Sequence, residues 1–199
     1  GVLGVGAGTV RRISRHAETI SMRGRRQPGV TRAGRHEPLA HLASRPAVVA
    51  VEAVSRACIL SEWTGARIHI LHISSADELR PLREAKARGV DVTGETCPQY
   101  LFLSADDYAR FGGVIRLNPP GREKDNQEPI FAALKDGTID MIATDHAPHS
   151  PEEKTRNDIW AVDCGFPGVE TQMPSMLTEV NAGRISICDY VRWSSFNPA

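Results

Sequence analysis

Apolar residues recur every three or four positions over residues 46–65. Pro46 suits the first turn of a helix, and Gly65 suits a helix end because glycine readily adopts the left-handed backbone of a C-terminal cap. The spacing therefore predicts a helix of roughly five turns.

A strand and a second helix are predicted immediately afterwards. In residues 67–73, β-branched isoleucines alternate with polar residues over most of the segment, as in a half-buried strand. Ser75 and Glu78 have the spacing of a capping box, and Gly89 would close the helix that this box opens.

This alternation of strand and helix continues along the chain. Strands are expected at 90–93, 114–117 and 139–143, a helical turn at 104–111, and helices at 124–135, 169–181 and 186–195. Such an order is typical of an α/β protein with a parallel sheet covered by helices. In a barrel or a doubly wound sheet, the chemistry lies in the loops after the carboxyl ends of the strands.

Residues 1–45 differ from the regular part at 46–199. Arginines crowd a Gly-rich stretch with little periodicity, which predicts one short strand followed by a loop. A nucleic-acid-binding arm is the alternative. The stretch has no aromatic residue, however, and Glu18 and Glu37 interrupt its charge, so a solvated loop is favoured.

The overall composition excludes several classes of protein. The 199 residues carry 24 Lys+Arg and 24 Asp+Glu, so no charge excess points to nucleic acid or a membrane surface. The sequence has no run of 18 apolar residues and no secretory signal pattern at its start. Its four cysteines are widely spaced without a C-x-x-C pair, which suits free thiols in a cytoplasmic protein.

Metal-competent side chains lie near the predicted strand ends, namely His16, His72, Glu95 and Asp145. Imidazole and carboxylate groups suit zinc and related divalent metals, and their recurrence on several strands favours a metal site. His69 and His72 are an odd number of positions apart, so on a strand they face opposite ways. His72, nearer the strand end, is the one expected to point into the mouth of the sheet.

Other polar residues have simpler interpretations. Glu95 is better explained as a carboxylate bonded to the backbone or to a neighbouring group than as a metal ligand. Cys97 is expected to be a packing residue, because burial leaves a thiol inert. His36 and His41 are expected to be exposed in a polar loop.

Four motifs together suggest a family. They are Gly94-Glu-Thr-Cys-Pro-Gln-Tyr-Leu101, Arg116-Leu-Asn-Pro-Pro-Gly-Arg122, Ala143-Thr-Asp-His-Ala-Pro-His149 and Gly165-Phe-Pro-Gly-Val-Glu-Thr171. In order and spacing the sequence resembles the cyclic amidohydrolases, which include dihydroorotase, allantoinase and hydantoinase (dihydropyrimidinase), from about Val10 to Ala199.

The resemblance implies a metal-dependent (β/α)8 TIM-type barrel with a two-zinc site that hydrolyses the C–N bond of cyclic amides. His16 and His72 would hold the second metal, whereas Asp145 would bind the first metal and act as general acid/base. Hydroxide formed at the metals would attack the ring carbonyl, and Asp145 would pass the proton to the departing ring nitrogen.

Finer features of the motifs favour a dihydroorotase-like activity. Asn118 and His149 resemble residues that contact the substrate's ring and carboxylate in that enzyme, and the backbone around Cys164 and Gly165 would close on the ring. Gly121 departs from the Leu or Ile common after Pro-Pro, so hydantoinase/dihydropyrimidinase and allantoinase stay as alternatives. The expected partner is a small cyclic amide, not nucleic acid or a membrane.

Parts of the family pattern are missing from the sequence. The first-strand His-x-His pair and the bridging carboxylated lysine, or aspartate, precede His16 in the family by more than the 15 residues available. A whole barrel needs roughly 250 residues, so we expect the C-terminal part of a barrel domain, without the first strands and the β-sandwich and with little activity alone. Its open edges favour a homo-oligomer. A non-catalytic, metal-free homologue and a plain α/β binding protein are the alternative classes.

Overall fold

Three parallel strands form the central sheet of the computed structural model, which describes residues 34–199. Their order is β1-β2-β3, and their bounds are β1 (Ile68–Ile70), β2 (Val92–Thr96) and β3 (Met141–Ile142). Ile68 is in register with Val92, and Thr96 with Ile142. The parallel α/β arrangement predicted for this part of the chain is confirmed. The strand predicted near His16 lies outside the described residues.

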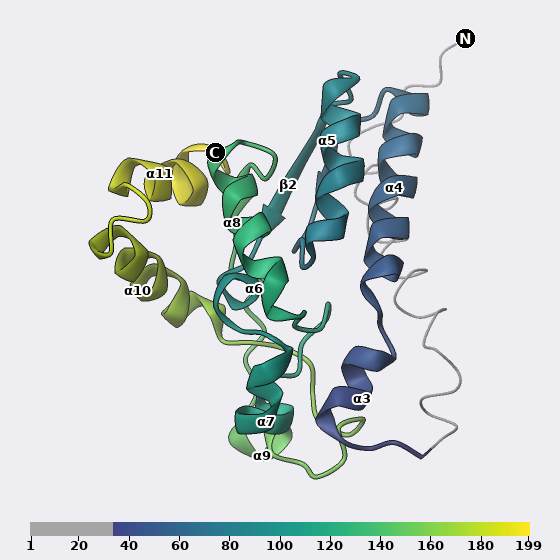
Figure 1. Cartoon of the computed structure of the whole chain (residues 1–199), viewed down its shortest axis with the longest axis vertical. Coiled ribbons are helices and arrows are strands. Elements are labelled where there is room, and N and C mark those ends of the chain that lie inside the picture. The colour runs from purple at the N-terminus through teal and green to yellow at the C-terminus, as the bar shows by residue number, and fades with distance from the viewer. Residues whose placement is uncertain (1–33) are drawn as a thin grey trace.

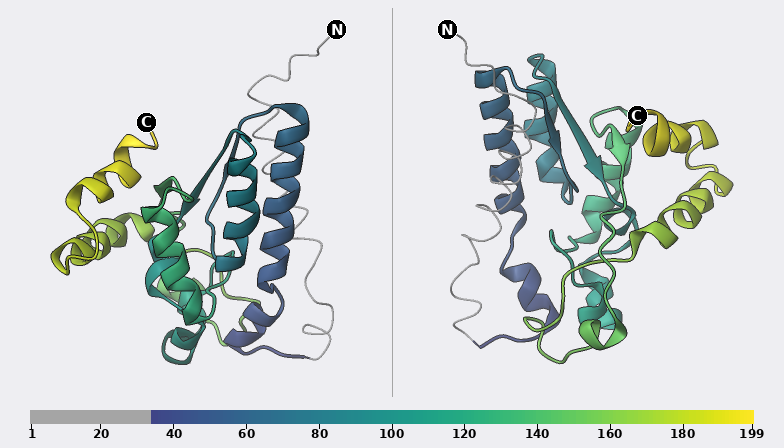
Figure 2. Two further views of the ribbon diagram at one scale, coloured as in Figure 1. Left: turned by 45° about the horizontal axis from the view of Figure 1, so that its top comes forward. Right: turned by 180° about the vertical axis from the view of Figure 1, so that it is seen from behind.

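The helices α4 (Ala47–Thr64) and α5 (Leu79–Ala87) lie side by side and pack against the sheet (Figures 1 and 2). As predicted, α4 ends at Gly65, which has a left-handed backbone with φ of 68°. Ser75 and Glu78 form the predicted capping box around a short 3-10 turn, η1 (Ala76–Glu78), which leads into α5. The apolar faces of both helices enter the core with Ile70 and Val92.

The core continues on the other side of β2, where α6 and α8 pack together and α10 packs on α6 (Figure 1). Phe131 and Ile139 are fully buried there. The predicted helices at 124–135, 169–181 and 186–195 are confirmed with small shifts of their ends. The elements are α6 (Pro98–Phe102), η4 (Lys124–Asn126), α8 (Gln127–Lys135), α10 (Gly168–Asn181), α11 (Ile187–Val191) and the π-helix η5 (Arg192–Phe196).

Short helices gather beyond one end of the sheet, at the bottom of Figure 1. They are α3 (Pro38–Ala43), η2 (Ala105–Asp107), α7 (Tyr108–Phe111), η3 (Gly112–Ile115) and α9 (Pro151–Lys154). The prediction of a strand at 114–117 is wrong, because residues up to Ile115 form a 3-10 helix. The backbone carbonyls of this segment bond to side chains instead of a neighbouring strand: Tyr108 donates to Ile115, Lys154 to Arg116 and His41 Nε2 lies 2.9 Å from the Leu117 oxygen.

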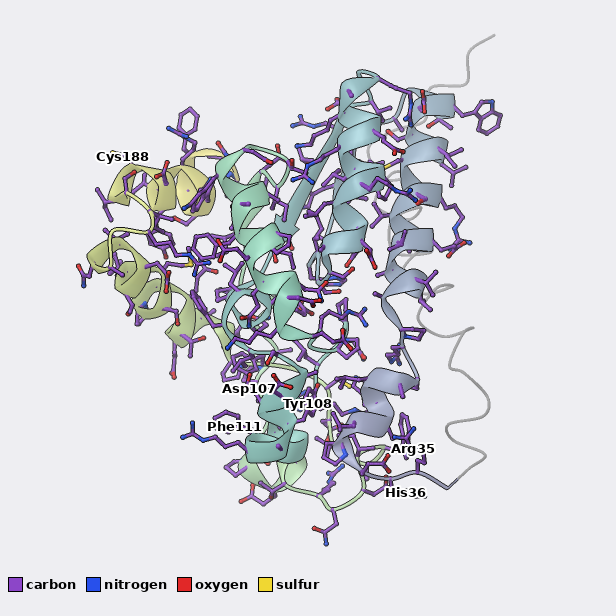
Figure 3. All side chains as sticks on the ribbon, viewed as in Figure 1. Arg35, His36, Asp107, Tyr108, Phe111 and Cys188 are labelled. Carbon is purple, nitrogen blue, oxygen red and sulfur yellow. The ribbon has the colours of Figure 1, made fainter. Side chains whose placement is uncertain are left out.

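His41 also corrects the prediction of a loop up to residue 45. It lies on α3, is fully buried, and meets the ring of Trp160 edge-on. The prediction of an exposed His41 was wrong: the arginine-rich stretch 1–45 was taken as one polar loop, although Leu39, Ala40, Leu42 and Ala43 around His41 are apolar. His36 is exposed as predicted, beside Arg35 before α3 (Figure 3), and pairs with Asp158 at 3.0 Å. Within residues 34–199, the helices are all too short or too polar to cross a membrane.

Candidate functional site

Thr96 connects the ends of all three strands. Its side chain is fully buried, and Oγ1 donates a 2.8 Å hydrogen bond to the Ile73 carbonyl. Its own carbonyl accepts a 2.9 Å bond from the Ala143 amide, and the Ile73 amide donates to the Glu95 carbonyl at 2.8 Å. Through these bonds, the residue after His72 and the segment before Asp145 are fixed relative to one another.

His72 and Asp145, both predicted metal ligands, have an unusual backbone conformation. Among residues 34–199 they are the only non-glycine residues with positive φ, at 41° and 46°. Left-handed backbone costs an L-residue roughly 1–2 kcal/mol, and such residues cluster at active sites and ligand clamps. His72 is half-buried and Asp145 is exposed, each a few residues beyond the end of its strand.

The left-handed turn also explains how His69 and His72 differ. His69 is on β1, whereas His72 lies past the strand end, so strand alternation does not govern its direction. His69 Nδ1 is 2.8 Å from Thr93 Oγ1, and His69 Nε2 is 3.0 Å from Glu95 Oε2. These three half-buried side chains share one face of the sheet. Glu95 is thus bonded to a neighbouring side chain, as expected, although it lies within β2 and not beyond its end.

A buried polar network holds the turn that follows His72. One carboxylate oxygen of Glu78 accepts hydrogen bonds from the backbone and hydroxyl groups of Ser74 and Ser75, at 2.8–3.0 Å. The buried Arg122 donates from Nη1 to the Arg45 carbonyl at 2.7 Å, and its Nε lies 3.4 Å from Ser74 Oγ. The network therefore ties the His72 loop to the Pro-Pro-Gly-Arg motif.

Two amide oxygens are buried without a hydrogen-bond partner within the described residues. Asn118 Oδ1 and Gln99 Oε1 accept no hydrogen bond from the described part of the chain. Gln99 Nε2 donates to the Thr144 carbonyl at 3.2 Å, so this side chain lies beside the residue before Asp145. Buried polar atoms are normally paired, which makes an unpaired oxygen a candidate ligand contact. Gln99 was missed from the sequence because glutamine alone carries no distinctive pattern.

Cys97 is confirmed as a buried packing residue beside Tyr100 and Leu117. Burial raises the pKa of its thiol well above the usual value, with Asp145 and Glu95 adding to the effect. A thiol in this state is a poor nucleophile.

The Asp145–His149 segment packs directly on the loop around Gly165. Ala147 N donates to the Phe166 carbonyl at 3.0 Å, and His149 Nε2 lies 3.2 Å from the Cys164 carbonyl. A Cβ at Gly165 would lie 2.1 Å from the Ala147 oxygen, so only glycine permits this approach. The predicted substrate-binding residues His149, Cys164 and Gly165 are therefore in one place.

Three metal-competent side chains gather at the edge of this segment. His149, Glu153 and Asp163 bring ligand atoms within 4.8 Å of one another. Each already has protein partners: His149 Nδ1 lies 3.3 Å from Glu153, Glu153 accepts from the Ser150 amide at 2.8 Å, and Asp163 pairs with Arg156 at 3.2 Å. The Ser150 amide is the largest cause of the lowered pKa of Glu153. The trio is satisfied by the protein itself.

The site therefore consists of two neighbouring parts. The strand ends carry His72 and Asp145, and the adjoining wall carries Asn118, His149, Cys164 and Gly165. His16 lies outside the described residues. The sequence indicated these residues through their motifs, and it indicated Glu78 through the capping box. It did not indicate the roles of Gln99 and Lys154, which contact Thr144 and Arg116 from 45 and 38 positions away.

Comparison with known proteins identifies the family. The chain is 39% identical to a dihydroorotase from Syntrophotalea carbinolica over 92% of the chain and 42% of the relative. It is 35% identical to an allantoinase from Solibacter usitatus over 81% of the chain and 35% of the relative. The solved structure of an L-hydantoinase (dihydropyrimidinase) from Arthrobacter aurescens matches with a TM-score of 0.81 and 32% identity, covering 92% of this chain and 40% of that one. A search against protein-family models found no match.

The chain belongs to the cyclic amidohydrolase family, in agreement with the resemblance of its motifs. It spans about two fifths of the length of two curated dihydroorotases that it matches. Its three-stranded parallel sheet and surrounding helices are consistent with part of the fold of the hydantoinase structures.

Proposed function

We propose that this chain forms part of a metal-dependent hydrolase of cyclic amides and contributes metal ligands and a substrate-binding wall. The observation that carries the proposal is the left-handed backbone shared by His72 and Asp145, which follow the two strands on either side of β2. Strained backbone persists only where the surrounding structure enforces it, and Thr96 and the Glu78 network provide that support here.

The donor groups at the strand ends fit the metal that the family implies. A half-buried imidazole and an exposed carboxylate are ligand types that zinc accepts. His72 and Asp145, with His16 from the segment outside the described residues, would hold zinc. When bound, zinc supplies a lowered pKa for a coordinated water and polarises the carbonyl to be attacked.

The other steps belong to the protein's own residues. Asp145 would accept a proton from the attacking water and deliver it to the ring nitrogen as the C–N bond breaks. Asn118 Oδ1, buried and unpaired within the described residues, would accept a hydrogen bond from the ring. The backbone at Cys164 and Gly165 would line the ring, and His149 would face the carboxylate of an acidic substrate.

Dihydroorotate is the substrate we favour. The support comes from Asn118 and His149 and from the dihydroorotases among the relatives. Hydantoins and dihydropyrimidines are the second candidate class, because the matching solved structures are hydantoinases and dihydropyrimidinases. Allantoin is a third candidate, and a small cyclic amide is common to all three. Self-association of the chain belongs to the same proposal.

Metal content tests the proposal directly. We would measure zinc per chain by elemental mass spectrometry after zinc loading and desalting, for the wild type, His72→Ala, Asp145→Ala and His36→Ala. His36 is an exposed histidine away from the strand ends and serves as the matched control. Zinc near one per chain that is lost in the His72 and Asp145 variants, but kept in His36→Ala, would support the site. Zinc absent from all four proteins would reject the site and favour a metal-free homologue. Equal zinc in all four would also reject it, because the metal would then bind elsewhere on the chain.

A further inference from the structure

Lys154 places a positive charge inside the wall of the proposed substrate site. The residue ends α9 and is only 7% exposed. Its Nζ donates to the carbonyls of Arg116 at 2.8 Å, Asp163 at 2.8 Å and Gly165 at 3.0 Å. An ammonium group has three donors, and here each has a backbone acceptor.

These acceptors come from two segments that are distant in sequence. The Arg116 carbonyl lies two residues before Asn118, whereas the Asp163 and Gly165 carbonyls lie on either side of Cys164. The Gly165 amide also donates to the Arg116 carbonyl at 3.1 Å. Lys154 therefore holds the Asn118 segment and the Cys164 segment together at one point.

A third segment rests on the same wall. Gly165 and Phe166 contact Ala147, and His149 Nε2 lies 3.2 Å from the Cys164 carbonyl. Asn118, His149, Cys164 and Gly165 thus all lie on segments that Lys154 joins directly or through one contact.

Stability alone is a poor explanation for this charge. Burying an ammonium group costs several kcal/mol before its hydrogen bonds are counted, and apolar side chains often replace buried ions without loss. Burial lowers the pKa of Lys154, in keeping with that cost. The ammonium group instead fixes the orientation of the backbone, because the three carbonyls that accept its hydrogen bonds must all point at Nζ. It also polarises the peptide between Asp163 and Cys164, which makes the Cys164 amide a stronger donor.

We propose that Lys154 is a positioning residue that sets the ring-binding wall formed by Asn118, Cys164 and Gly165. This inference rests on the proposed function and extends it to a residue that does not itself touch the substrate. The wall is built around one cation, so removing the charge loosens the wall and weakens binding of the ring, while the sheet and its helices keep their structure.

The test compares Lys154→Met, which keeps a long unbranched side chain but removes its charge, with Lys124→Met. Lys124 is exposed and serves as the matched control. Amide hydrogen exchange by NMR would follow Gly165, whose amide bonds to Arg116, and Ile139, whose amide bonds to Ala133 in the core. Affinities for L-dihydroorotate, hydantoin and allantoin would be measured by titration of the zinc-loaded 199-residue chain.

Lys154→Met removes all three hydrogen bonds of the ammonium group. We therefore expect exchange at Gly165 to be at least about tenfold faster and the affinity for the bound amide at least about tenfold weaker. Ile139 should be unchanged, and Lys124→Met should match the wild type. Unchanged affinity in Lys154→Met, with or without faster exchange, would overturn the positioning role. Failure of the wild type to bind any of the three amides would instead reject the proposed function, and the role of Lys154 with it.

A variant that unfolds would show fast exchange at Ile139 as well. In that case Lys154→Ala would be titrated with and without n-propylammonium, which can refill the vacated space and its carbonyl cage. Recovery of affinity with propylammonium, and not with uncharged n-propanol, would support the role of the ammonium. Equal recovery with both, or none with either, would contradict it.

Discussion

His72 and Asp145 adopt the same left-handed backbone at the ends of β1 and β3, the two strands that flank β2. Alanine at such a position keeps the steric penalty, whereas glycine removes it. We therefore expect His72→Gly to be more stable than His72→Ala by about 1 kcal/mol, with the same order at Asp145. Urea denaturation would measure the difference. At His36, which lacks a positive φ, alanine should be at least as stable as glycine. If His72→Ala were also at least as stable as His72→Gly, the backbone at His72 would not be strained.

Thr96→Val tests the connection between the strand ends. The substitution keeps the shape but removes the hydroxyl that donates to Ile73, leaving a buried carbonyl without that bond. We expect a loss of about 1–3 kcal/mol in the free energy of unfolding and weaker zinc binding, because the His72 turn loses its support. Thr178→Val, on the exposed side of α10, should change stability by less than about 0.5 kcal/mol. Equal effects of the two substitutions would show that Thr96 has no special role.

Glu78 offers a second test of the His72 turn. Because one oxygen accepts four hydrogen bonds, Glu78→Ala should cost about 3 kcal/mol and should weaken zinc binding. Glu78→Gln, which keeps an acceptor oxygen, should fall between the wild type and the alanine variant. The neighbouring exposed Asp77→Ala serves as control. If Glu78→Ala lost stability but kept the zinc affinity of the wild type, the Glu78 network would support folding and not the metal site.

The regular elements could be predicted from the sequence because they depend on local spacing. The helix up to Gly65, the Ser75–Glu78 capping box and the helix at 124–135 each have a local pattern, and each is confirmed. The strand predicted at 114–117 was wrong because its carbonyls bond to Tyr108 and Lys154, partners that no local pattern reveals.

Site residues were predictable to the extent that they lie in motifs. His72 and Asp145 follow strands whose patterns are visible, so their proximity to the strand ends could be foreseen. The burial of His41 could not, because it depends on Leu117 and Trp160, which are 76 and 119 positions away. The role of Lys154 could not be predicted for the same reason, because its neighbours in sequence do not indicate that three backbone carbonyls surround its Nζ.

Thiol reactivity should separate the exposed Cys188 from the buried Cys58 and Cys97. Burial raises the pKa of Cys58 and of Cys97, whereas Cys188 is exposed on α11 (Figure 3). We expect a maleimide reagent to modify Cys188 rapidly in the native protein and Cys58 and Cys97 only after denaturation, as read by mass spectrometry of peptides. Cys188→Ser should abolish the fast phase of labelling. Fast native labelling of Cys97 would contradict its packed position.

Acid should weaken α9 through Glu153. The amide of Ser150 holds the pKa of Glu153 below its usual value of 4.5. A carboxyl with a lowered pKa in the folded state stabilises that state above its unfolded pKa, and the contribution disappears as the pH falls through the folded value. Glu153→Gln should therefore be less stable than the wild type at neutral pH, and the two stability curves should converge as the pH falls below about 4.5.

Urea midpoints across this pH range would measure the convergence, with the exposed Glu170→Gln as control for the loss of one charge. Because Lys154 follows Glu153 directly, hydrogen exchange at Gly165 should also accelerate in Glu153→Gln at neutral pH. Parallel curves for the wild type and Glu153→Gln would show that the capping carboxylate adds nothing to the stability of the folded chain. Faster exchange at Gly165 with an unchanged midpoint would confine the effect of Glu153 to α9 and the wall that Lys154 holds.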